Sequence, residues 1–211
     1  MRKFLFPVLA VILLAGCATT RTQTPAAIYD FGLQRRSDAA PGQPVLSASL
    51  SVAVTSSAWL DSPAIQYRLA YHDPARSYLY ASNRWAAAPA TLLAQRVKTR
   101  VAAVNNDGVV SASDGIHADY ALRLELEEFS QVFDTIDQSH AVVRLRASLI
   151  ERSTRLLLAQ RSFSVEQAAP ATNAASAVRA LTWASDKLID NLIDWLAETL
   201  PEEAKKSPQG P

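Results

Sequence analysis

The chain contains 211 residues, of which 49% are hydrophobic, 21 are basic and 20 are acidic, so its formal net charge is +1. This length and apolar content favour one domain with a sizeable core and argue against a disordered stalk. A charge so close to zero gives no reason to expect a nucleic-acid partner or a polybasic segment that binds anionic lipid. The single cysteine excludes an intramolecular disulfide.

The N-terminus has the pattern of a bacterial lipoprotein leader. Arg2 and Lys3 precede an apolar run at residues 4–15, about a dozen residues long, whereas crossing a bilayer takes roughly 20. The run ends in Leu-Ala-Gly before Cys17, as in the sites that lipoprotein signal peptidase cleaves. We therefore expect Cys17 to be acylated and to begin the mature chain. An ordinary cleaved signal peptide and an uncleaved anchor are the alternatives.

Cleavage before Cys17 would leave 195 residues (211 − 16), and the loss of two cations would make the net charge −1 (19 basic, 20 acidic). Attachment through two or more acyl chains is firm, whereas one chain gives only marginal binding. Ala18 is not the aspartate that retains many Gram-negative lipoproteins in the inner membrane. We therefore expect the periplasmic face of the outer membrane, with residues 17–27 as a flexible tether of about 15–20 Å.

Short strands and one helix are predicted in the first half of the domain. Five segments have the apolar or alternating pattern of strands: residues 28–33, 46–54, 65–71, 78–80 and 109–110. Residues 34–44, with charges and prolines, are typical of a loop. At residues 86–104 the apolar period becomes helical, with Pro89 in the first turn and Gly108 just after the end.

The clearest alternation lies in the second half of the chain. It predicts three consecutive strands at residues 120–129, 141–149 and 156–165, and Phe129 breaks the parity, so we expect a bulge near Glu127. Consecutive strands of this kind favour an antiparallel meander with one solvated face. Five charged side chains on that face can pair across strands: Arg123, Glu125, Glu127, Arg144 and Arg146.

A long helix with a broad apolar stripe is predicted at residues 174–200, capped by Asn173 and stopped by Pro201. At 1.5 Å per residue it would extend roughly 40 Å and cross the sheet. Residues 201–211 are expected to form a disordered tail. Together these elements predict an α/β (α+β) fold. It consists of a single domain at residues 28–200 with a mixed, largely antiparallel sheet and two main helices packed on it.

No set of residues indicates catalysis. His72, His117 and His140 have no second ligand at useful spacing, and no paired cysteines or His-Glu-x-x-His motif occur, so we expect neither a metal nor a cofactor. An acyl-transfer elbow and a phosphate-binding loop are also missing from the sequence. We expect a protein that is not an enzyme.

Two clusters of aromatic and charged residues are candidates for contact with a partner. Trp59 and Asp61 lie shortly before Tyr67, and Arg84 and Trp85 immediately precede the first helix. In one interpretation the three aromatic residues belong to the core and the aspartate caps a turn. In the other, the five residues line a groove or an interface, where Trp, Tyr and Arg are enriched.

In this order behind the leader, the clusters resemble those of the ABC-type transport auxiliary lipoproteins. These are the PqiC-like outer-membrane partners of mammalian-cell-entry-type (MCE) lipid transport systems. Four further segments share the resemblance: the start at residues 29–33, Ala121-Leu122 leading to Phe129, Arg161-Ser162-Phe163 and Asp194-Trp195-Leu196. Together these segments span nearly all of the mature chain.

The resemblance implies a non-enzymatic periplasmic component that helps an inner-membrane ATPase and its MCE protein to move phospholipid or other hydrophobic molecules between membranes. It also implies an α/β fold and suggests a homo-oligomeric ring around the end of an MCE conduit. A different hypothesis is a periplasmic lipoprotein that assists outer-membrane or cell-wall assembly through a ligand or partner groove.

Overall fold

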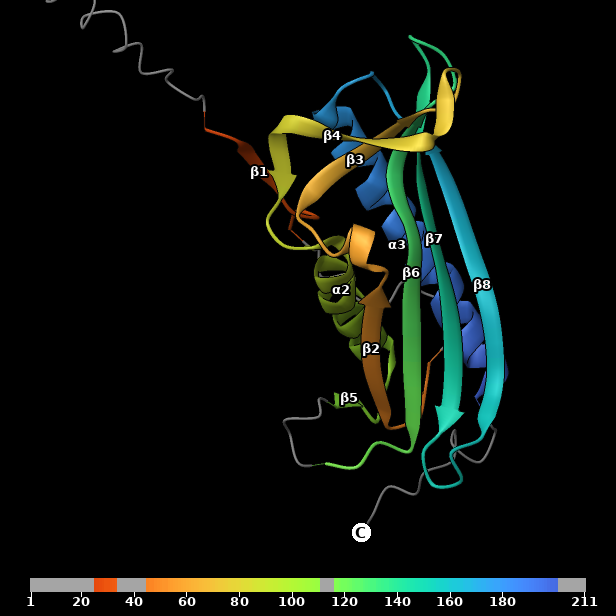
Figure 1. Cartoon of the computed structure of the whole chain (residues 1–211). Coiled ribbons are helices and arrows are strands. Elements are labelled where there is room, and N and C mark those ends of the chain that lie inside the picture. The colour runs from red at the N-terminus through yellow and green to blue at the C-terminus, as the bar shows by residue number, and fades with distance from the viewer. Residues whose placement is uncertain (1–24, 34–44, 111–115, 201–211) are drawn as a thin grey trace, which may run out of the picture.

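The structure is a computed structural model, which describes residues 25–33, 45–110 and 116–200. An eight-stranded sheet with two long helices accounts for most of these residues (Figure 1). The strands are β1 (Ala27–Tyr29), β2 (Leu50–Ser56), β3 (Ala64–Leu69), β4 (Asp73–Trp85), β5 (Val109–Val110), β6 (Tyr120–Phe133), β7 (Ser139–Glu151) and β8 (Leu157–Ala168). The helices are the 3-10 turn η2 (Ala58–Leu60), α2 (Pro89–Val104) and α3 (Ala174–Thr199).

The predicted fold class is confirmed: a mixed α/β domain whose C-terminal helix is long. The predicted leader at residues 1–16, Cys17, most of the tether, the loop at 34–44 and the tail at 201–211 lie outside the described residues.

The sheet is built around β6. One edge of β6 pairs antiparallel with β7, and β7 pairs in the same way with β8, which confirms the predicted meander. Two strands share the other edge, both parallel to β6: β2 pairs with residues 120–126 and β3 with residues 131–133. The sheet continues beyond β2 into β5, and beyond β3 into β4 and β1.

A bulge in β6 lies where its parallel neighbour changes from β2 to β3. The register with β7 shifts between Leu126 and Glu128. Before the shift Leu124 and Leu126 are buried, and after it the buried apolar residues are Phe129 and Phe133. One extra residue therefore moves the alternation by one position, and the bulge predicted near Glu127 is confirmed.

Several predicted strands have different limits in the structure. The strand expected at residues 28–33 is β1, which ends at Tyr29. The strand expected at residues 46–54 is continuous only from Leu50; before it, Leu46 makes an isolated parallel bridge with Asn105, and the Asn105 side chain binds the N–H and the carbonyl of Ala48. The strand expected at residues 78–80 is the middle of β4, which is 13 residues long. Most of β4 is exposed, so its sequence lacks the alternation of a half-buried strand.

Helix α3 begins at Ala174, as predicted, whereas α2 begins at Pro89, three residues after the predicted start at residue 86. Pro89 is the first residue of α2, and Gly108 follows its end with a φ of 77°. Asn173 caps α3, because its side-chain oxygen accepts a hydrogen bond from the N–H of Ser176 at 2.9 Å. The caps satisfy backbone groups that the helix itself leaves without partners.

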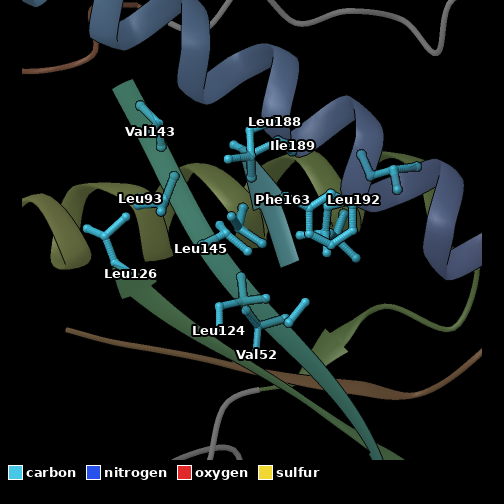
Figure 2. Packing of buried hydrophobic residues seen from close by; sticks show 14 of the residues in the cluster. Val52, Leu93, Leu124, Leu126, Val143, Leu145, Phe163, Leu188, Ile189 and Leu192 are labelled. Atoms are coloured by element: carbon cyan, nitrogen blue, oxygen red, sulfur yellow. The ribbon is translucent and has the colours of Figure 1, made fainter. Parts of the chain in front are cut away.

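Both helices cover the same face of the sheet. In Figure 1, α3 lies behind β6, β7 and β8, and α2 lies beside β2. Figure 2 shows the buried side chains between the layers, among them Leu93, Leu124, Leu126, Val143, Leu145, Phe163, Leu188, Ile189 and Leu192. Burying each such side chain contributes about 1.5–3 kcal/mol, so this layer is the main source of the domain's stability.

The opposite face of the meander, which we call the helix-free face, carries polar side chains. Arg146 of β7 pairs there with Glu125 of β6 and lies 3.9 Å from a carboxylate oxygen of Glu127. The predicted cross-strand pairing is thus confirmed for Arg146 with Glu125 and Glu127, whereas the side chains of Arg123 and Arg144 form no ion pair among the described residues. Exposed pairs of this kind contribute only about 0.2–1 kcal/mol each.

Candidate functional site

Trp85, at the end of β4, is a core residue with 1% of its surface exposed. Its ring packs edge-on against Phe31 at 5.7 Å and against Phe129 at 5.6 Å between centroids. The three rings join the end of β4, the segment after β1 and the position just past the β6 bulge. Trp85 therefore stabilises the fold and leaves no surface for a partner.

The segment after β1 is fixed a second time by Arg96 of α2, which is only 9% exposed. One guanidinium nitrogen donates to the carbonyls of Phe31 and Gly32 at 3.4 and 3.5 Å. The other two donate to the carboxylate of Asp186 on α3 at 2.8 and 2.7 Å. This one side chain therefore connects both long helices to the segment that follows the predicted tether.

A second ion pair extends this contact by one helical turn. Arg100 pairs with Asp190 and lies 3.8 Å from a carboxylate oxygen of Asp186. The sequence pattern did not predict this cluster, because its two halves are 90 residues apart. The spacing of the charged residues could have indicated the contact. Two arginines lie four residues apart on one helix, and two aspartates lie four residues apart on the other, so each pair lies on one helical face.

Trp59 lies in η2 beside the β6 bulge, and 43% of its surface is exposed. The guanidinium of Arg68 in β3 lies 5.3 Å from the centre of its ring and 3.5 Å from a carboxylate oxygen of Glu128. The side-chain nitrogen of Gln66 donates to the carbonyl of Trp59 at 2.8 Å, which fixes the turn. An exposed indole held over an arginine is the kind of surface that protein interfaces use.

Two buried oxygens occur in this part of β6. Within the described ranges, Oε1 of Glu128 and Oγ of Ser130 have no hydrogen-bond partner. A buried oxygen without a donor costs about 1–3 kcal/mol. Both oxygens are covered by other parts of the domain, so this cost lies within the fold and offers no surface to a partner.

Tyr67 belongs to a separate aromatic cluster between β3, β4 and β6. It packs against three rings, with centroids at 5.2 Å (Tyr78), 4.8 Å (Tyr80) and 5.6 Å (Phe133). The hydroxyl of Tyr80 donates to Gln131 at 2.6 Å, and Gln131 in turn donates to Ser139 at 2.7 Å. Burial, with a smaller contribution from Tyr67, raises the pKa of Tyr80 to about 12. The cluster is a packed and hydrogen-bonded part of the fold.

Asp61 and Arg84 are exposed. Neither side chain makes a hydrogen bond or an ion pair with another residue of the described ranges. The structure therefore does not bring the five predicted residues together in one groove. Trp85 lies in the core, Tyr67 lies in its own cluster, and Trp59 is the large exposed aromatic residue of the set.

In the part of the chain that the structure describes, no group of three or more histidine, cysteine, aspartate or glutamate side chains is placed to hold a metal ion. No helix in the same residues is long and apolar enough to cross a bilayer.

The family model described as "ABC-type transport auxiliary lipoprotein component" matches residues 31–192, which is most of the folded domain. The chain belongs to this family. It is therefore a lipoprotein component that is auxiliary to ABC-type transport. No curated protein matches the chain.

Two crystal structures share the fold of this auxiliary lipoprotein. A Xanthomonas campestris protein assigned to the DUF330 family aligns with a TM-score of 0.73 at 23% identity, over 85% of this chain and 99% of its own. An uncharacterized protein aligns with a TM-score of 0.59 at 13% identity, over 82% of this chain and 99% of its own. At such identities the likeness concerns the fold alone.

Proposed function

We propose that this chain is a non-enzymatic lipoprotein, anchored to the periplasmic face of the outer membrane, that assists an ABC transporter containing an MCE protein. The cargo would be phospholipid or another hydrophobic molecule moving between the two membranes. The family match across residues 31–192 is the observation that carries the proposal. The lipoprotein pattern ending at Cys17 supports the anchor.

The way the chain enters the domain supports a positioning role. Nine residues separate Cys17 from the start of β1 at Ala27 (26 − 17), a span of about 15–20 Å for a flexible chain. Directly after β1, Phe31 is held by Trp85 and by Arg96. An acylated Cys17 would therefore keep the whole rigid domain close to the membrane surface.

The exposed Trp59 and its neighbour Arg68 are the surface that we propose for the MCE protein. The cation and the indole are already in contact, so little side-chain entropy is lost when a partner covers them.

Self-assembly into a ring is a further part of this proposal. In the described part of the chain, β8 pairs only with β7, so its outer edge offers unpaired backbone groups. Such an edge can bind a strand of another chain. A second copy of this protein is the partner that would generate a ring.

Affinity purification of the full chain from detergent-solubilised envelopes tests the proposal. We expect an MCE-domain protein to copurify. We also expect density-gradient separation to place the protein, acylated at Cys17, in the outer-membrane fraction. Recovery of intact lipoprotein without any MCE protein would contradict the transport role. Fractionation with the inner membrane would contradict only the location.

A further inference from the structure

A groove at the end of the sheet where β2, β6 and β7 meet differs in charge from the rest of the chain. Its volume is about 760 Å³, which lies within the range of about 300–1,000 Å³ typical of small-molecule sites. It is lined from the helix-free face by Arg123 and Ile150, and past β5 it reaches Lys98 of α2. The groove is possible because β5 covers only the first two residues of β2.

Four cations line the groove, and no carboxylate does: Lys98, Arg123, Arg152 and Arg155. Among the residues that the structure describes, none of the four is in an ion pair, whereas Arg146 and Arg68 on neighbouring parts of the sheet are both paired. In a chain of net charge +1, such a concentration of unneutralised cations favours an anionic ligand.

The backbone places these cations before any ligand arrives. Arg123 stands opposite Ala53 of β2 and Ser148 of β7, whose side chains are too short to cover it. Arg152 donates its N–H to the carbonyl of Asp119 at 2.9 Å. Arg155 has a φ of 62°, in the left-handed region that few residues other than glycine and asparagine adopt. The turn between β7 and β8 therefore holds both arginines at the groove.

Apart from Ser51, the remaining residues that line the groove are apolar. Ile150 of β7 and Val110 of β5 line it together with Ile116, of which 62% is exposed. A free phosphate would use the cations and leave these side chains in water. A molecule with an anionic head and an apolar body covers both kinds of wall.

We propose that this groove binds an anionic phospholipid. Its phosphate lies among Arg123, Arg152, Arg155 and Lys98, and its glycerol and first acyl carbons lie against Ile116 and Ile150. This inference rests on the proposed function, and it assigns the place where this chain itself touches the cargo. Arginine donates to a phosphate through two parallel N–H groups, so the arginines carry most of the recognition.

The test uses the full chain in its own membrane. A benzophenone-bearing amino acid replaces Ile150 in the groove or, as a control, Gln160 on β8, which lies outside it. Cells labelled with radioactive phosphate are irradiated, and the protein is isolated. A thioether-linked acyl anchor contains no phosphorus, so a radioactive protein band reports a cross-linked phospholipid. We expect this band for the Ile150 site and not for the Gln160 site, with the adduct mass of an anionic phospholipid.

Charge variants make the test specific for the headgroup. Combining Arg123→Gln and Arg152→Gln should lower the yield of the adduct by roughly tenfold or more. Arg144→Gln, which removes an exposed arginine outside the groove, should leave the yield unchanged. An unchanged melting temperature in all variants confirms that the loss is one of binding.

Four results would overturn the inference: no phospholipid adduct at Ile150, an adduct with a zwitterionic lipid only, an adduct with a protein in place of a lipid, or a yield independent of both arginines. Recovery of the MCE protein from the same cells separates the two proposals. Without a lipid adduct, but with the MCE protein, the groove assignment fails and the proposed function stands. With a lipid adduct, but without the MCE protein, the groove assignment stands and the proposed function fails.

Discussion

Arg96 of α2 and Asp186 of α3 form a two-point ion pair, with nitrogen–oxygen distances of 2.8 and 2.7 Å. The same guanidinium binds the carbonyls of Phe31 and Gly32. A single buried side chain therefore connects the two helices to the segment through which the chain from the proposed anchor enters the domain.

Arg96→Met should destabilise the domain by about 1–3 kcal/mol. The change leaves Asp186 and two carbonyls without their donor, and the value lies below that of a fully buried pair because 30% of the Asp186 side chain is exposed. Thermal unfolding should shift down by about 2–4 °C for each kcal/mol. The control Lys187→Met, at an exposed neighbouring position, should have little effect. Adding Asp186→Leu to Arg96→Met should restore part of the loss, and equal melting temperatures for Arg96→Met and the native chain would contradict the assigned role.

Leu188→Asp should lower the free energy of unfolding by several kcal/mol, because Leu188 is 0% exposed and faces the sheet from α3 (Figure 2). The matched control is Lys187→Asp, which places the same carboxylate one residue earlier on the exposed side of the helix. Urea denaturation of the two variants measures the difference. Similar midpoints would show that the stripe of α3 facing the core had been assigned wrongly.

Tyr80 should make the stability fall at alkaline pH. Its pKa is raised to about 12 in the folded state, whereas in the unfolded chain it is about 10. Below about pH 10 the contribution of protonated Tyr80 to the free energy of unfolding is fully present. Between about pH 10 and pH 12 the unfolded state loses this proton while the folded state keeps it, so the free energy of unfolding decreases.

Replacing Tyr80 tests that dependence. Tyr80→Phe should weaken the alkaline decrease and should also cost about 1–3 kcal/mol at neutral pH, because buried Gln131 loses its donor. Tyr78→Phe, in the same aromatic cluster, is the control. The measurement is chemical denaturation as a function of pH. An identical alkaline profile for Tyr80→Phe and the native chain would contradict the assignment.

Trp59→Ala should reduce recovery of the MCE protein while changing the stability by less than about 1 kcal/mol, since exposed cation–π contacts contribute about 0.5–1 kcal/mol. Trp183→Ala is the matched control, because that tryptophan is also about half exposed but lies on α3. Quantitative copurification distinguishes the two variants. Equal losses, or a loss only with Trp183→Ala, would place the partner surface on the helical face.

Cys17→Ser should abolish outer-membrane fractionation. Without the thiol no acyl chain can be attached, and the apolar segment at residues 4–15 would stay uncleaved or leave a soluble product. Sucrose-gradient fractionation followed by detection of the protein measures the outcome. If the variant still sediments with the outer membrane, the proposed lipid anchor is wrong.

Local chemistry determined much of this fold. The alternation of residues 120–165 predicted the β6–β7–β8 meander, because each strand buries one face against α3. The change of parity at Phe129 predicted the bulge. Pro89 and Asn173 marked the starts of the two long helices, since their side chains act within one turn of their own position in the sequence.

Features that depend on distant residues were decided by the tertiary structure alone. Strands β2 and β3 both pair in parallel with β6, which is far from them in the sequence. The ion pair between Arg96 and Asp186 also joins segments that are far apart in the chain. Trp59 and Trp85 have similar sequence surroundings, yet one is exposed and the other is buried. A side chain's own neighbours in sequence set its periodicity and its caps, whereas its burial and its ion-pair partners depend on which segments the folded chain brings against it.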